Sequence, residues 1–368
     1  MQRRKKSVYE ALALSNEIGY KVITKIARNP EKFDSFELYS KLCAKNALDI
    51  NDENSIDKVI EDLRTSLKQN HKNLNLVFGK RVESMFGMLA ASLGKCSLIK
   101  QEDGGETFCN EDISIPDYRL VLKEDNSSFL VEVKNYHREP FENKFSFTRR
   151  YFESVLRYSE LVRCPVKFAI YYSKMNMWAL LSSDAFELQR GRYVVDLPTA
   201  MMQNELITIG DEWISTKPPF EIYIVSDPSK PAHYDDKTGE TNFIIKNVLC
   251  YCAGSLLETD KEKELLNLFA MYGKWSETEV IPVVVKGNRL IGIKYKFEPE
   301  EYSTNGFDHI GQLSSMISST YKMATEENGS VVAIETTREA KSFSIVIPDD
   351  YDSKLLPLWR FKMQPNKG

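Results

Sequence analysis

Residues 115–137 read "IPDYRLVLKEDNSSFLVEVKNYH", two apolar runs separated by a polar turn. This pattern is typical of a β-hairpin. Asp117, Glu132 and Lys134 nevertheless stand inside the apolar runs. Charged side chains are rarely buried unless they are paired, so three of them in one apolar hairpin indicate a chemical role.

The expected geometry of the hairpin brings these three side chains together. Alternate residues of a strand share a face, so Glu132 and Lys134 point to the same side. If the turn pairs Leu122 with Phe129, Asp117 falls opposite Lys134 and diagonal to Glu132. Diagonal neighbours lie roughly 7–8 Å apart at Cα, within joint reach of one ion.

Two carboxylates and an ammonium at one point suit metal-assisted hydrolysis. Two close carboxylates cannot both ionise cheaply, and a divalent cation removes that conflict. Hard oxygen ligands favour Mg²⁺, with Mn²⁺ as a substitute. The nearby lysine can orient or deprotonate a water, or offset charge on a phosphoryl group. The alternative is a surface hairpin with incidental charges, which the apolar run "FLVEVKNYH" disfavours.

The order of the motifs adds to this interpretation. An acidic residue two positions before a lysine occurs at five places, but only residues 132–134 lie in an apolar run that follows a Pro-Asp pair. Pro116-Asp117 followed by Glu132-Val133-Lys134 resembles the PD-(D/E)XK nuclease superfamily, over roughly residues 71–195. The Mrr-like and Holliday-junction-resolvase-like branches are the most similar in pattern, and no motif separates them.

The resemblance implies a role for each residue. Asp117 and Glu132 would bind the metal together with the Val133 carbonyl, and Lys134 would act on the attacking water. Members of the superfamily often carry a further acid on the preceding helix, and Glu83 in "RVESMFG" matches that position. The alternative for Glu83 is an ordinary glutamate on a helix surface.

A helix is expected over residues 145–163, after the Glu-x-Lys strand. It carries Arg149, Arg150 and Arg157, and the last two are seven residues apart, so they share a helix face. In the superfamily this helix often contacts the phosphate backbone. We therefore expect these arginines to bind nucleic acid, with a solvated helix face as the alternative.

The rest of the chain divides into three expected regions. Residues 1–70 have helical periodicity, 71–230 would form the nuclease domain, and 241–368 would form a C-terminal α+β domain of unknown role. The expected fold class is α/β, with a restriction-endonuclease-like mixed sheet flanked by helices. No apolar run approaches the ~20 residues of a membrane span, and no secretory signal follows the basic start, so we expect a cytoplasmic protein.

The function expected from the sequence is metal-dependent hydrolysis of DNA, in bacterial defence (including antiviral defence), restriction or repair. DNA follows from the resemblance, and RNA stays open. The net charge of −4 gives no global nucleic-acid signature. The alternative is a non-catalytic nucleic-acid-binding or assembly protein on a nuclease-like scaffold. Cutting both strands with one active site per chain would favour a homodimer. Contact with a second copy or with a partner protein through the C-terminal domain stays open.

Overall fold

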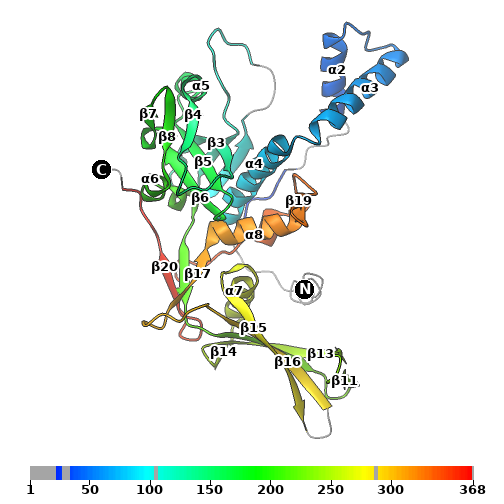
Figure 1. Ribbon diagram of the computed structural model, residues 1–368, viewed down its shortest axis with the longest axis vertical. Helices are drawn as coiled ribbons and strands as arrows, with labels where there is room; N and C mark the ends of the chain where they lie inside the picture. Colours follow the sequence, from blue (N-terminus) through cyan, green and yellow to red (C-terminus); the bar gives the residue numbers. More distant parts are fainter. Residues whose placement is uncertain (1–21, 27–33, 103–106, 286–288, 367–368) are drawn as a thin grey trace.

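The chain is a mixed α/β structure with several sheets. The structure, a computed structural model, describes residues 22–26, 34–102, 107–285 and 289–366. A five-stranded sheet flanked by helices lies in the upper half of Figure 1, and a second five-stranded sheet lies at the lower end.

The first sheet contains the hairpin. Its strand order is β1-β2-β3-β5-β6, and only the β3–β5 pair is parallel. The strands are β1 (Cys96–Gln101), β2 (Tyr118–Leu122), β3 (Ser128–Tyr136), β5 (Val166–Tyr172) and β6 (Met177–Ser182). Most of β3 is buried on both faces, as expected for a central strand.

Helices cover both faces of this sheet because successive residues of β3 point to opposite sides. Val131 and Val133 pack with α4 (Leu74–Leu93), whose buried residues repeat with helical spacing. Leu130 packs on the other face with α5 (Arg149–Leu161). Glu132 and Lys134 have the same parity as Leu130 and therefore belong to the α5 face.

The helix expected over residues 145–163 is shorter than predicted. Its first four residues form β4 (Phe145–Thr148), which pairs with β8 (Arg192–Val195) in a small sheet that includes β7 (Glu187–Gln189). Phe145 and Phe147 alternate into the core as in a strand. Thr148 then accepts a hydrogen bond from the Tyr151 amide and caps α5, which sets where the helix begins.

A helix from the C-terminal third completes the α4 face of the first sheet. It is α8 (Leu313–Thr325), and Ile317 and Tyr321 on it share the core with α4. The indole nitrogen of Trp178 on β6 donates to Ser318 Oγ at 2.9 Å. Arg81 on α4 is 2% exposed and pairs with Glu326 at 3.0 Å, just after α8 ends.

The second sheet is antiparallel, in the order β14-β13-β10-β16-β15, and α7 (Asp260–Tyr272) packs on one face. Its strands are β10 (Phe220–Ser226), β13 (Ile245–Cys252), β14 (Ser255–Leu256), β15 (Ser276–Val285) and β16 (Arg289–Glu298). β10 lies inside the expected range 71–230 but pairs with strands from beyond residue 240. α8 lies beyond residue 240 but packs in the first core. The expected domain boundaries therefore separate segments that pack together in the structure.

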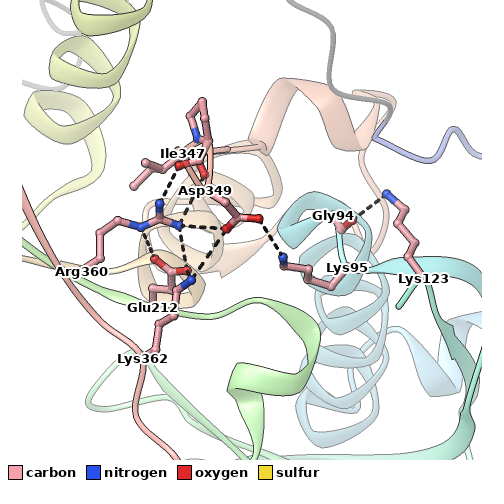
Figure 2. A network of polar contacts seen from close by, with 9 residues as sticks. Gly94, Lys95, Lys123, Glu212, Ile347, Asp349, Arg360 and Lys362 are labelled. Carbon is pink, nitrogen blue, oxygen red and sulfur yellow. Dashed lines mark hydrogen bonds and ion pairs between the residues drawn. The ribbon is translucent and has the colours of Figure 1, made fainter. Parts of the chain in front are cut away.

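A three-stranded sheet joins the two units. Its order is β17-β9-β20, from β17 (Asp308–Gln312), β9 (Trp213–Thr216) and β20 (Leu358–Phe361). Figure 2 shows the polar network beside it. Arg360 binds Glu212 at 2.6 Å, and Asp349 lies 3.7 Å from Lys95, where α4 gives way to β1. The C-terminal strand is thus tied to the first unit.

Short elements and two N-terminal helices complete the described chain. The expected helical region 1–70 includes α2 (Ser35–Lys45) and α3 (Glu53–Asn70), while residues 1–21 and 27–33 lie outside the described part. Among the described residues, no helix combines the length and apolar character needed to cross a membrane. The short elements are α6 (Leu197–Met202), β11 (Ala232–Tyr234), β12 (Thr241–Phe243), β18 (Glu326–Glu327), β19 (Ser330–Val331) and the 3₁₀ turns Ser183–Ala185, Leu206–Ile209 and Ala340–Phe343.

Candidate active site

The register of the β2–β3 hairpin differs from the expected one by two residues. Leu120, not Leu122, pairs with Phe129, and the last paired residues are Tyr118 and Val131. The reason lies in the turn: the Leu122 amide donates to the Ser127 carbonyl, which closes the loop two residues earlier on β3 than expected. As a result, Asp117 is level with Glu132 instead of diagonal to it.

Asp117 lies where β2 and β3 begin to separate. Its carboxylate, rather than a backbone carbonyl, accepts the Val133 amide hydrogen, with 2.7 Å between Oδ2 and N. On the other side its carbonyl accepts the Glu102 amide at 2.9 Å, so β1 still runs beside it. The side chain therefore fills the fork between two strands, directly beside the backbone of the Glu-x-Lys segment.

Glu132 and Lys134 form a close ion pair on the α5 face. The Glu132 side chain is only 2% exposed, whereas that of Lys134 is 34% exposed. The hydroxyl of Tyr151, on the first turn of α5, donates to Oε1 of Glu132 at 2.5 Å and lies 3.3 Å from the Lys134 ammonium. Both donors use the same carboxylate oxygen, and Oε2 takes part in no hydrogen bond within the described residues.

Electrostatics mark the same group of residues. Burial, Glu132 and Glu83, in that order, raise the pKa of Asp117 to about 7, against the opposing effect of Lys134 and the Val133 amide. Burial alone would lower the pKa of Lys134, but Glu132, Tyr151 and Asp117 together raise it above its usual value. A carboxyl that holds its proton near neutrality beside a second acid is typical of functional sites.

Glu83 approaches the site from the opposite side of the sheet, on α4. Its carboxylate pairs with Lys80 at 2.7 Å and is 23% exposed. Its carbonyl accepts the Tyr118 hydroxyl at 3.1 Å, which holds this turn of α4 over the start of β2. The negative charge of Glu83 contributes to the raised pKa of Asp117, so its carboxylate lies close enough to act on the Asp117 carboxyl.

Tyr151 is a residue of the site that was not among those expected from the sequence. The available signal was its spacing: Tyr151 and Tyr158 are seven residues apart on α5, and each donates to a buried acid of the sheet. Tyr158 binds Glu102, which also pairs with Arg119 at 2.6 Å. Of these two tyrosines, Tyr151 is the one that reaches Glu132 and Lys134.

The three arginines of α5 do not form one surface. Arg150 and Arg157 share a face as expected, and both bind Asp112: Arg150 Nε lies 2.8 Å from its carboxylate and Arg157 Nε 2.8 Å from its carbonyl. Arg149 instead pairs with Glu153 at 2.7 Å. Arg150 is 84% exposed at the side chain and remains accessible to a large ligand.

The residues present fit a magnesium ion held by few protein ligands. Within the described parts of the chain, no three His, Cys, Asp or Glu side chains converge closely enough to form a metal cluster. Asp117 and Glu132 offer two carboxylates at one place, with Oε2 of Glu132 available. Mg²⁺ commonly uses one or two carboxylates and keeps several waters, so this donor set suits it.

Comparison with known proteins gives a limited result. No protein-family model matches the chain, and no curated protein matches it. Among solved structures, it is similar to Hjc, a Holliday junction resolvase from Archaeoglobus fulgidus, with a TM-score of 0.25 and 11% identity. That likeness covers 30% of this chain and 84% of the resolvase. The functional proposal therefore rests on the residues of this chain.

Proposed function

We propose that the chain is a metal-dependent nuclease that hydrolyses phosphodiester bonds, with DNA as its substrate. The observation that carries the proposal is the placement of Asp117 at the fork between β2 and β3, level with the buried Glu132 and beside Lys134. A buried and a half-buried acid beside a partly exposed lysine cost stability, and such arrangements concentrate at functional sites. Metal-assisted hydrolysis of a phosphodiester uses acids to hold the ion and a positive group beside the phosphate.

Each residue has a distinct proposed role. Asp117, Glu132 and the Val133 carbonyl would hold Mg²⁺ or Mn²⁺, with Glu83 as a further acid acting directly or through a water. When bound, the metal would lower the pKa of a water and polarise a phosphoryl oxygen. Lys134 would orient the attacking water and offset negative charge on the phosphate, because its ammonium is the positive group nearest the two acids.

Arg149, Arg150 and Arg157 are proposed to contact the phosphate backbone. Such contacts provide affinity without sequence information. Since Asp112 binds Arg150 and Arg157, nucleic acid would have to compete with this carboxylate. A phosphate can take the place of the Asp112 carboxylate because both are anions, so the two arginines keep a negatively charged partner throughout.

The second candidate function is a non-catalytic nucleic-acid-binding or assembly protein on a nuclease-like scaffold. One observation favours it: Lys134 and Tyr151 already satisfy Oε1 of Glu132, so the acid is stable in this fold without a metal. Loss of plasmid cleavage on chelation separates the two candidates, because only the nuclease needs the ion.

The deciding experiment incubates the purified chain with Mg²⁺ or Mn²⁺ and a panel of linear, nicked, circular, single-stranded and branched DNA, together with RNA. We expect cleavage that stops with EDTA and in an Asp117→Ala/Glu132→Ala variant. Cleavage that survives both treatments would show contamination or another site. The same panel tests the preference for DNA over RNA, and measurement of the chain's mass in solution tests the proposed homodimer.

A further inference from the structure

The three-stranded sheet β17-β9-β20 presents aromatic side chains on one face. Trp213 on β9 pairs in register with Phe361 on β20, and Ser215 lies between Trp359 and His309, so these side chains share a side. Trp359 is 42% exposed and Phe361 46%. We call this surface the aromatic face; it consists of Trp213, Phe307, His309, Trp359 and Phe361.

The rings of this face are ordered by contacts with one another. Phe307 stacks on Trp359 with ring centroids 4.2 Å apart and an angle of 5°. Trp213 stacks on His309 at 4.9 Å, and Trp359 meets Phe361 edge to face at 6.3 Å. Exposed rings that are already fixed in this way lose little conformational freedom when they bind a flat partner.

Two lysines add positive charge to the aromatic face. The Lys217 ammonium lies 5.4 Å from the centroid of Phe307, and that of Lys274 lies 5.7 Å from the centroid of Trp213. Neither ammonium has a carboxylate within ion-pair distance in the part of the chain that the structure describes. Their charge is therefore available to an anionic ligand, and the cation–π contacts keep it beside the rings.

A cavity of ≈ 280 Å³ adjoins the face at Trp213 and is also lined by Met177, Met201, Met363 and Gln312. Gln312 is 4% exposed and donates Nε2 to Asp211 at 2.5 Å, while its Oε1 has no partner among the described residues. His309 Nε2 and Gln312 Oε1 are two of nine buried side-chain atoms without a partner in the described residues. Gln312 also lines the cavity, so its Oε1 is an acceptor that a donor entering there would satisfy.

We propose that the aromatic face is a binding site for single-stranded nucleic acid. Bases stack on Trp359 and Phe361, Lys217 and Lys274 contact the phosphates, and one base edge donates an N–H to Gln312 Oε1. Single strands supply a group for each of these features: bases for the rings, phosphates for the lysines and N–H donors for Gln312 Oε1. Duplex DNA buries its base faces, and a protein strand added to β20 would use neither lysine.

The surface lies outside the proposed nuclease site and would hold a strand independently of cleavage. Its test uses the full chain in EDTA, so that metal-dependent cutting is prevented, and labelled 20-nucleotide single-stranded DNA, single-stranded RNA and duplex DNA. Fluorescence anisotropy measures affinity at several salt concentrations. We expect single strands to bind more tightly than duplex at this surface, and the two single-stranded arms show which sugar it accepts.

Two variants and one control make the test specific. Trp359→Ala should weaken single-strand binding between about fivefold and a hundredfold, the range for loss of one stacked base. Lys217→Ala with Lys274→Ala should lower the salt slope by about 0.7 for each phosphate that the protein no longer neutralises. Lys58→Ala with Lys68→Ala removes the same charge from exposed positions on α3 and should leave affinity for single strands within twofold of the parent.

Lys217 and Lys274 do not touch the core, so their double variant should fold even if Trp359→Ala does not. Unchanged affinity for single strands in the double lysine variant would overturn the proposal. A change of oligomeric state in Trp359→Ala with unaltered DNA binding would also overturn it and assign the face to a protein partner. Cleavage is not measured in this test. If the substitutions weaken binding and the chain has no nuclease activity, the single-strand site stands and only the nuclease proposal is refuted.

Discussion

The Tyr151 hydroxyl and the Glu132 carboxylate are joined by a hydrogen bond of 2.5 Å that links the first turn of α5 to the centre of β3. The bond reaches the same oxygen as the Lys134 ammonium. Tyr151 can therefore hold Glu132 in place when Lys134 turns toward a substrate. This relationship makes α5 part of the candidate site and not only its cover.

We expect Asp117→Ala and Glu132→Ala each to abolish cleavage while the fold is retained. Asp117→Ala removes one of two acids that repel each other without metal, so thermal stability of the metal-free chain should hold or rise slightly. Glu132→Ala leaves Lys134 and Tyr151 without their shared acceptor and should lower it. Lys134→Ala should also be inactive, yet it should still bind metal, because both carboxylates remain. Gel assays and metal-binding calorimetry measure the two effects, and full activity in either acid variant would remove the site assignment.

Tyr151→Phe should change the metal dependence of cleavage, since Glu132 loses one of its two donors and pairs more tightly with Lys134. The concentration of Mg²⁺ for half-maximal cutting should rise several-fold. Tyr158→Phe is the matched control, because it removes an equivalent hydroxyl from the same helix, where it binds Glu102. Both variants should lose roughly 1–3 kcal/mol of stability. If Tyr158→Phe shifted the metal dependence as much as Tyr151→Phe does, the effect would come from the packing of α5 and not from the hydroxyl that binds Glu132.

The raised pKa of Asp117 predicts how stability depends on pH. Its pKa is about 7 in the fold and 3.8 in the reference state, so the folded chain binds this proton more tightly than the unfolded chain. The stability that this bound proton contributes to the fold is present at low pH and is lost as pH rises from about 4 to about 7. In EDTA, the free energy of unfolding of Asp117→Asn should therefore exceed that of the parent by more at pH 7.5 than at pH 4.5. The extra difference should be on the order of 1–3 kcal/mol. Urea unfolding at the two pH values checks this, and an equal difference at both would contradict it.

Asp112 is expected to restrain the arginines of α5. Arg150→Ala with Arg157→Ala should weaken DNA binding for all sequences and lower the salt slope by about 0.9 for each duplex phosphate that is no longer neutralised. Asp112→Asn should do the reverse and tighten binding, because both arginines lose a competing anion. Binding titrations at several salt concentrations measure both. An unchanged slope in the double variant would show that this face of α5 does not meet DNA.

Glu83→Gln tests the acid on α4. The substitution keeps the shape of the side chain but removes its charge, so a ligand role predicts that half-maximal cutting needs several-fold more Mg²⁺; a factor of ten corresponds to about 1.4 kcal/mol. A solvated role predicts a change below about 0.5 kcal/mol, since Lys80 is its direct partner. A metal titration that overlays the parent curve would exclude Glu83 and leave Asp117, Glu132 and Lys134 as the site.

The sequence by itself determined the central features of the hairpin. Period-two alternation in "FLVEVKNYH" put Glu132 and Lys134 on one face, and the polar turn made β2 and β3 neighbours. The seven-residue spacing of Arg150 and Arg157 likewise gave a shared helix face. These features are local: they depend on the repeat of one strand or one helix, which nearby residues specify.

Only the tertiary structure decided the register, the partners and the limits of the units. A turn that closes two residues earlier on β3 brings Asp117 level with Glu132, and no residue count in the loop reveals that hydrogen bond in advance. Tyr151 meets Glu132, and Asp112 meets the arginines, because separate segments pack together. α8 belongs to the first core and β10 to the second sheet for the same reason: apolar faces bury against whichever surface the whole chain brings near, and that choice is absent from any single stretch of sequence.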